Sequence, residues 1–261
     1  MQEQMLCYEY AGNELTRHGL QVEQVFAVVD AFSKRDTVAD HLEVVDKLSQ
    51  LIVLASRTDL RSKYIRFFHS AESYLLRLQA HPQVDSAVLT LQLRDVRAML
   101  QRLYHCESII TTSLRENHFF RKLRQQSAKY SVKMQLPELW LWGNQQLAQR
   151  RKDIARWSVC LQLLRELNSA MLLFLRKNSN AVEVETVNGS YQHECANLQQ
   201  QLHLLQIIWS AQKNLMVPCI KANFKSIRIS FNYLQNMHTE SISASARVQY
   251  PISFRLILGV V

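Results

Sequence analysis

The stretch "VEVETVNGSYQHE", Val182 to Glu194, is the clearest β-sheet signal in the chain. Apolar and acidic side chains alternate before its centre, which is the period of a strand with one buried face. Asn188-Gly189 follows, and both residue types accept the positive φ angles of a type I′ turn. The stretch therefore predicts a β-hairpin.

Alternating or apolar runs on both sides of this hairpin predict more strands. They are "MLCYEY" (5–10), "YSVKMQL" (130–136), "LHLLQIIW" (202–209), "FKSIRISFNYL" (224–234) and "VQYPISFRLIL" (248–258). In "LPELWLW" (136–142), Trp140 and Trp142 are two residues apart, which predicts a buried strand with both rings on one face.

The first half of the chain has helical periodicity instead. Apolar residues recur at helical spacing over 13–32, 38–55, 60–78 and 84–110. Asp59 and Asp85 lie where the third and fourth helices should begin. Two more helical segments are expected within 147–179.

These patterns predict an α+β fold: an N-terminal antiparallel helical bundle followed by a mainly antiparallel β domain with helical insertions. The predicted domains are residues 12–127, helical, and residues 128–261, β-rich. An N-terminal strand over residues 4–10 can return to join the second domain's sheet.

Charge narrows the classes of partner. The chain has 31 Lys and Arg against 22 Asp and Glu, a net charge of +9, which favours nucleic acid, anionic lipid or an acidic protein surface. No leader peptide and no apolar run of the ~20 residues needed to cross a bilayer are apparent. We therefore expect a cytoplasmic protein with no membrane span.

No catalytic motif is recognisable. The five glycines do not form a dinucleotide or phosphate-binding loop, and neither Gly-x-Ser-x-Gly nor His-Glu-x-x-His occurs. His193 and Cys195 are too few ligands for a zinc site. We expect no metal, no cofactor and no enzyme, although an enzyme of unrecognised type stays an open alternative.

The positive charge is concentrated. Ten Lys or Arg lie between Arg115 and Arg156, against three acidic residues. A run of charge is ordinarily a solvated face, but this one falls at the predicted domain junction, where a groove can present it to carboxylates or phosphates. The neighbouring tryptophans keep a nucleic-acid-binding protein as the alternative, although no RNA-recognition or KH motif is present.

Motifs spread over nearly the whole chain resemble the ZapD family of FtsZ-binding cell-division proteins. They include "YEYAGNELTR", "DLRSKYIRFF", "LREN", "QLPELWLW", "AQRRKDIARW", "VNGSYQ" and "ISFRLIL", in this order. The resemblance implies a non-catalytic homodimer of the mid-cell division ring. Such a protein binds the C-terminal tail of FtsZ through a basic pocket and cross-links FtsZ filaments into bundles.

The resemblance and the charge cluster together indicate the basic residues that bind the tail. His118 stands where an Arg is usual, and Gln21 and Trp140 stand where a basic or imidazole side chain is expected. The candidate set is Arg57, Arg61, Arg115, His118, Arg121, Lys122, Arg124, Arg150, Lys221, Lys225 and Arg228.

Overall fold

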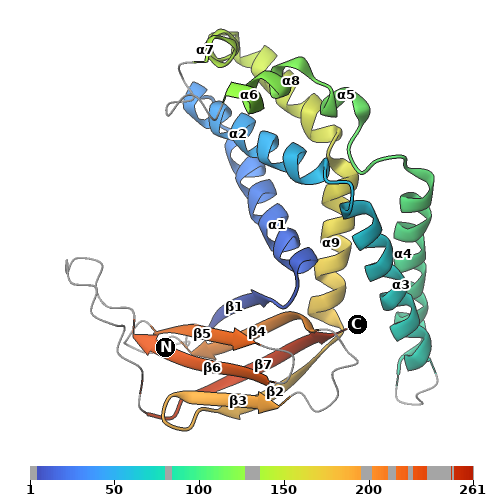
Figure 1. The fold of residues 1–261 in the computed structure, drawn as a ribbon, viewed down its shortest axis with the longest axis vertical. Helices are drawn as coiled ribbons and strands as arrows, with labels where there is room; N and C mark the ends of the chain where they lie inside the picture. Colours follow the sequence, from blue (N-terminus) through green and yellow to red (C-terminus); the bar gives the residue numbers. More distant parts are fainter. Residues whose placement is uncertain are drawn as a thin grey trace. The chain divides into compact units, whose positions relative to one another are not determined.

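Helices and strands separate into two units in the computed structural model (Figure 1). The sheet unit is Met1–Arg17 with Phe174–Val261, and the helical unit is His18–Leu173. The structure describes residues 5–79, 84–126, 136–194, 202–210, 216–222, 226–233, 248 and 250–260. The predicted domain boundary between residues 127 and 128 lies outside these ranges.

The predicted α+β class is confirmed. The helices of the described residues are α1 (Glu14–Phe32), α2 (Val38–Ala55), α3 (Leu60–Leu78), α4 (Ser86–His105), α5 (Thr112–Arg115), α6 (His118–Gln126), α7 (Pro137–Gly143), α8 (Leu147–Val159) and α9 (Gln162–Lys177). The helical unit buries one face of each long helix, including Leu48 and Ile52 of α2 and Tyr64 and Phe68 of α3.

Helix starts follow local capping chemistry. The Asp85 carboxylate accepts hydrogen bonds from the backbone N–H of Ala87 at 2.8 Å and Val88 at 3.3 Å, as predicted for the start of α4. Asp59 occupies the N-cap position of α3, but its carboxylate makes no capping bond there. It pairs instead with the side chains of Arg57 and Lys63.

The predicted strand over 136–142 is wrong, because "PELWLWG" is the helix α7. Pro137 begins it, where a missing N–H costs nothing, and Glu138 favours the first turn. At helical spacing Leu139 and Trp142 point inward, whereas Trp140 is 59% exposed. The two tryptophans therefore lie on different faces. The predicted strand over 130–136 falls almost wholly outside the described residues.

The sheet unit holds two antiparallel sheets. The strands are β1 (Met5–Ala11), β2 (Ser179–Glu185), β3 (Ser190–Glu194), β4 (Leu202–Ser210), β5 (Met216–Ala222), β6 (Ser226–Tyr233) and β7 (Ser253–Val260). Their orders are β1-β4-β7-β2 and β3-β6-β5. Phe231 of β6 contacts Trp209 of β4 and Phe254 of β7, with ring centroids 5.7 and 5.5 Å apart, so the two sheets share one core.

The predicted turn at Asn188-Gly189 is present, with φ angles of 49° and 65°. The flanking strands do not pair along their length, however, because β2 pairs with β7 and β3 pairs with β6. A Cβ on Gly189 would lie 1.6 Å from the carbonyl oxygen of Val248, so the turn requires glycine for space as well as for φ. The hairpin prediction therefore had the turn right and the pairing wrong.

The N-terminal strand joins the first sheet by pairing with β4. The Glu9 carboxylate accepts hydrogen bonds from Arg176 at 2.7 and 2.8 Å and from Gln206 at 2.7 Å. Because Arg176 belongs to α9 and Gln206 to β4, this partly buried ion pair holds strand and helix together within the sheet unit.

Asn13 connects the start of α1 to β4. Its side-chain oxygen accepts from the backbone N–H of Thr16 at 2.9 Å, and its amide nitrogen lies 2.7 Å from Nδ1 of His203. His203 is 9% exposed, and burial lowers its pKa to about 4. The imidazole is therefore neutral at pH 7, and its Nδ1 accepts a hydrogen bond from the Asn13 amide.

This buried imidazole predicts a stability difference with pH. Since the unfolded His203 takes up a proton near pH 6.5 and the folded one only near 4, stability is full above pH 6.5 and is lost as the pH falls toward 4. Between pH 7.5 and 5 the unmodified protein should lose about 2 kcal/mol more than His203→Gln. Denaturant unfolding at several pH values measures this, and equal losses in both proteins would contradict it.

Candidate functional site

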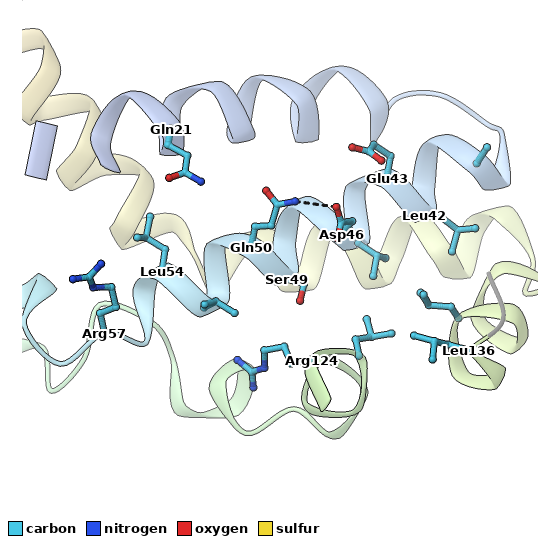
Figure 2. A pocket seen from close by; sticks show the side chains of 15 residues that line it. Gln21, Leu42, Glu43, Asp46, Ser49, Gln50, Leu54, Arg57, Arg124 and Leu136 are labelled. Atoms are coloured by element: carbon cyan, nitrogen blue, oxygen red, sulfur yellow. Dashed lines mark hydrogen bonds between the residues drawn. The ribbon is translucent and has the colours of Figure 1, made fainter. Parts of the chain in front are cut away.

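An apolar cavity of about 730 Å³ follows α2 in the helical unit (Figure 2). Figure 2 shows the lining side chains of α2 in a row, with Arg57 toward one end and Leu42 and Glu43 toward the other, while Gln21 and Arg124 come from other helices. The lining comprises Gln21, Ala39, Leu42, Glu43, Val45, Asp46, Ser49, Gln50, Val53, Leu54, Arg57, Leu123, Arg124, Leu136 and Leu139. The cavity thus combines apolar walls with a few charged groups, as binding sites for peptides and small ligands do.

Two of the predicted basic residues line this cavity. Arg57 follows the end of α2, and its guanidinium lies 3.3 Å from the Asp59 carboxylate and 3.4 Å from Nε2 of His18. Hydrogen bonds from Lys63 and Arg57 lower the pKa of Asp59 to about 2. Asp59 therefore stays ionised at any ordinary pH and orients Arg57.

Arg124 reaches the cavity from α6. Its guanidinium donates a hydrogen bond of 3.4 Å to the backbone carbonyl of Arg115, at the end of α5. Phe120, fully buried on the same helix, anchors α6 in the core. A long basic side chain held at its base by packing and at its tip by a carbonyl is partly pre-oriented for an incoming carboxylate.

The other basic residues of α5 and α6 are close in sequence but differ in their contacts. Arg115, His118 and Arg121 are exposed. Lys122 donates a hydrogen bond of 2.7 Å to the Glu138 carboxylate, which joins α6 to α7 and lowers the pKa of Glu138. Lys122 thus has an acidic partner within the chain.

The apolar walls come partly from a segment that sequence analysis placed in a sheet. Leu136 and Leu139 line the cavity because α7 is a helix that buries them on one side. Val53, 53% exposed on α2, offers apolar surface on the facing side. Pro137 with Glu138 at a helix start was the signal that could have predicted this wall.

Arg61 and Arg150 do not line the cavity. Arg61 donates two hydrogen bonds, of 2.7 and 3.0 Å, to the carbonyl of Leu103, and so satisfies the last turn of α4. Arg150 is 6% exposed. Both guanidinium groups are used inside the helical unit.

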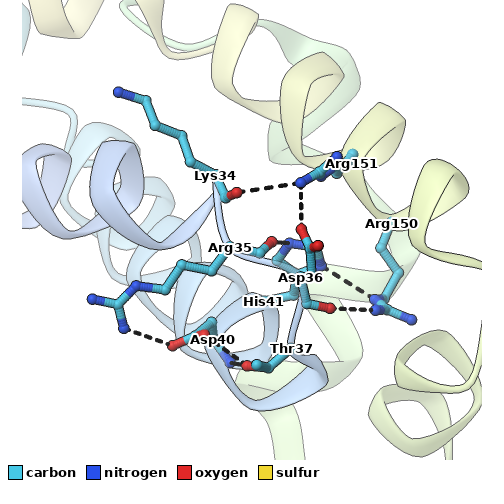
Figure 3. Close-up of polar contacts among 8 residues, drawn as sticks. All are labelled: Lys34, Arg35, Asp36, Thr37, Asp40, His41, Arg150 and Arg151. Carbon is cyan, nitrogen blue, oxygen red and sulfur yellow. Dashed lines mark hydrogen bonds and ion pairs between the residues drawn. The ribbon is translucent and has the colours of Figure 1, made fainter.

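Figure 3 shows Arg150 and Arg151 reaching from α8 toward the loop between α1 and α2. Arg150 donates to Nδ1 of His41 at 3.2 Å and to three backbone carbonyls, those of Gly143, Gln145 and Asp36, at 3.1, 2.5 and 3.2 Å. His41 is fully buried, and desolvation lowers its pKa, so the imidazole is neutral and accepts from Arg150. Arg150 therefore joins three segments as a structural cation.

The predicted residues of the sheet unit lie on strands. Lys221 of β5 and Arg228 of β6 are cross-strand partners and are exposed, and Arg228 donates to the Gln192 side chain at 3.0 Å. Lys225 lies outside the described residues.

Two of the tryptophans beside the cationic segment, Trp142 and Trp157, are core residues, whereas Trp140 is exposed. Trp142 and Trp157 are 5% and 4% exposed and contact Phe119, whose ring stacks on Trp157 at 5.4 Å between centroids. The indole nitrogen of Trp142 donates to the Asp153 carboxylate at 3.2 Å. Packed in this way, the rings of Trp142 and Trp157 have no free face for a nucleic-acid base.

The described residues were also compared with the requirements of a metal site and of a membrane-spanning helix. Within the described ranges, no group of three or more His, Cys, Asp and Glu side chains could hold a metal ion. No single helix there is long and apolar enough to cross a membrane. The bent pair α8 and α9 passes that test only jointly, and several of its apolar side chains, including Leu164 and Leu167, are fully buried in the protein.

The buried contacts of Arg150 predict a large loss of stability on substitution. Arg150→Met leaves three carbonyls and the His41 ring without their donor, so we expect a loss of about 3–5 kcal/mol. The adjacent Arg151→Met, which removes one exposed ion pair with Asp36, should cost about 1 kcal/mol or less. Urea unfolding of both variants tests this, and similar losses would contradict the structural role of Arg150.

Comparison with known proteins gives one consistent result. The chain matches the ZapD family model, described as a cell division protein, over residues 20–230. It is 28% identical over 229 residues to the cell division protein ZapD of Nitrosomonas europaea, which covers 87% of this chain and 86% of the relative. It is 24% identical over 243 residues to that of Cupriavidus metallidurans, which covers 92% and 96%. The chain therefore belongs to the ZapD family of cell division proteins.

Proposed function

We propose that this protein binds the C-terminal tail of FtsZ and, as a homodimer, cross-links FtsZ filaments into bundles at the division ring in the cytoplasm. It does so without catalysis. Membership of a cell division family supports the process, and the cavity along α2 supports the binding mode. The observation that carries the proposal is that Arg57 and Arg124, predicted as tail-binding residues from sequence, line one apolar cavity.

The cavity suits a peptide segment that carries both apolar and acidic side chains. Val53, Leu123 and Leu139 provide apolar contact, and burial of such surface supplies affinity at about 25 cal/mol per Å². Arg57 and Arg124 supply charge-assisted hydrogen bonds to carboxylates and so set which peptides fit.

Exposed cations on α5 and α6 extend the positive surface next to Arg124. Arg115, His118 and Arg121 are exposed. His118 and Arg121 lie on the same helix as Arg124, and Arg115 ends the helix before it. Exposed ion pairs are individually worth about 0–1 kcal/mol, so these residues contribute mainly to attraction at a distance. We leave Arg61 and Arg150 out of the proposed site because neither of them lines the cavity.

Each site is then weak, and cross-linking depends on two such sites being joined in one dimer. Filaments present many tails, so a dimer bound by one subunit meets the next tail at high effective concentration. Two modest sites therefore bundle filaments that a single site would hold only briefly.

Charge reversal at the cavity tests the site. Arg57→Glu with Arg124→Glu should weaken binding of a fluorescent FtsZ tail peptide by about tenfold or more, because attraction becomes repulsion. Val53→Asp should weaken it too, since a carboxylate would stand in the apolar wall. Fluorescence anisotropy with the peptide, and co-sedimentation with polymerised FtsZ, measure both effects.

The matched control is Arg66→Glu with Lys152→Glu, which changes the net charge equally at exposed positions that do not line the cavity. Its binding should stay close to that of the unmodified protein. If cavity and control variants bind alike, the cavity is not the site. If none of the proteins binds the peptide but all bind random DNA, the nucleic-acid alternative replaces the proposal.

Salt dependence tests the electrostatic share separately. Raising the salt from about 50 mM to about 300 mM shortens the screening length from about 14 Å to about 6 Å, so exposed cations lose most of their attraction while apolar contact persists. Co-sedimentation with FtsZ should fall steeply for the unmodified protein and only slightly for the Arg57→Glu/Arg124→Glu variant. Bundling that ignores salt would argue against carboxylate recognition by these arginines.

A further inference from the structure

The cavity along α2 has the dimensions and lining of a site for a chain molecule. Its lining positions on α2 run from Ala39 to Leu54, which is about 22 Å of helix. Leu123 of α6 and Leu139 of α7 supply further apolar wall. A cavity of about 730 Å³ is within the range of pockets that enclose small organic ligands. It is therefore long enough and large enough for a flexible chain with one polar end.

The walls of this cavity offer few polar groups to a ligand. More than half of the lining residues are aliphatic, including Leu42, Val53 and Leu136. Among the uncharged polar lining residues, Gln50 already donates a hydrogen bond of 2.9 Å to Asp46. An extended peptide brings backbone donors and acceptors that need partners when they are buried. An alkyl chain brings none, so these walls suit it as they stand.

One end of the cavity carries an excess of positive charge. Figure 2 shows Arg57 at that end, with the Arg124 guanidinium directed toward it. The Asp59 carboxylate pairs with Arg57 at 3.3 Å and with Lys63 at 2.6 Å, so one anion faces two cations. Arg124 donates to the backbone carbonyl of Arg115, and a carbonyl carries no net charge. An anionic group is therefore attracted to this end.

The remainder of the cavity carries carboxylates. Figure 2 shows Glu43 toward the end opposite Arg57, and Asp46 between the two. Glu43 pairs with Lys47 at 3.1 Å. Asp46 accepts the hydrogen bond from Gln50. These carboxylates repel a further carboxylate, so charge sets the direction in which an anionic amphiphile lies.

We propose that the cavity along α2 binds a single-chain anionic amphiphile of the fatty-acid type, with its carboxylate at Arg57 and Arg124. The alkyl chain lies along the aliphatic walls and ends toward Leu42 and Leu136. The planar guanidinium donors match a carboxylate, which supplies selectivity for the head group. Burial of the chain supplies most of the affinity, because each methylene removes apolar surface from water.

Such a ligand would regulate the proposed function. The amphiphile and the FtsZ tail use the same arginines and the same apolar walls, so only one of them can occupy the cavity. Competition between them therefore rests on the proposed function, whereas binding of the amphiphile does not. By mass action, a rise in free amphiphile should release filaments from bundles.

The first test compares chain lengths and head groups on the unmodified protein. Isothermal titration calorimetry with dodecanoate, below the concentration at which it forms micelles, should show one molecule bound per chain. Octanoate should bind at least about tenfold more weakly, since each methylene contributes up to about fourfold. Dodecyltrimethylammonium has the same alkyl chain with a cationic head, and it should also bind at least about tenfold more weakly.

The second test removes the cations. Arg57→Gln with Arg124→Gln should weaken dodecanoate binding by about tenfold or more, because the carboxylate loses both of its charged partners. The matched control is Arg66→Gln with Lys152→Gln, which removes the same charge at exposed positions that do not line the cavity. Its dodecanoate affinity should stay close to that of the unmodified protein. Circular dichroism checks that both variants are folded.

A third variant tests the apolar wall. Val53 is 53% exposed, so the fold should tolerate Val53→Asp. Dodecanoate binding should weaken by about tenfold or more, because the alkyl chain would pass a charged group. Binding of many dodecanoate molecules per chain with no preference for the anionic head is adventitious and overturns the inference. Equal dodecanoate affinity in the cavity variants and the control overturns it too.

Competition separates this inference from the proposed function. Dodecanoate that displaces a fluorescent FtsZ tail peptide, measured by anisotropy, supports both. If dodecanoate binds with the expected variant pattern but does not displace the peptide, the tail binds elsewhere, and only the proposed tail site fails. If the peptide binds with its expected variant pattern and dodecanoate does not bind, only the amphiphile inference fails.

Discussion

The guanidinium of Arg150 is the contact on which the arrangement of the cavity depends. Its four hydrogen bonds reach the loop before α2, His41 within α2, and the turn after α7. A charge buried to this degree is tolerated only when it is fully hydrogen-bonded. The segments that carry the acceptors must therefore lie within hydrogen-bond distance of the guanidinium. Since α2 and α7 supply opposite walls of the cavity, a contact that touches no ligand determines its width.

Periodicity predicted most of the fold because most elements have one face against a core. The four N-terminal helices and the strands β1, β4, β6 and β7 lie where alternation or helical spacing placed them. The strand prediction for "LPELWLW" failed because a short, mostly apolar run fits either period, and the decisive signal was Pro137 followed by Glu138. β5 was missed because Pro218 interrupts it, although an edge strand tolerates proline. The strands before and after Asn188-Gly189, β2 and β3, belong to different sheets. This separation depends on tertiary packing, which no local sequence pattern encodes.

The sequence predicts the excess of positive charge, but it does not predict which basic residues have partners within the chain. The cations between Arg115 and Arg156 were predicted to form one surface, yet Arg150 is buried and Lys122 is paired with Glu138. Arg57, far away in sequence, lies at the same cavity as Arg124 because α2 packs beside α6. The apolar walls were not predicted at all, since Leu136 and Leu139 become neighbours of Val53 only after folding. A basic residue therefore indicates binding only once its contacts within the chain are known.

The cations that line the cavity are partly engaged within the chain, and this bears on affinity. Asp59 holds Arg57, and the carbonyl of Arg115 holds Arg124, so an incoming carboxylate shares or replaces an existing contact and gains less than it would from a solvated guanidinium. The same contacts reduce the side-chain entropy lost on binding, because the guanidinium groups are already oriented. A modest gain in binding free energy, together with a small loss of side-chain entropy, gives a site that binds and releases its ligand readily. The protein is proposed to link filaments that must also come apart. When weak sites are joined in a dimer, many simultaneous contacts stabilise a bundle, and the bundle dissociates when a few of them are lost.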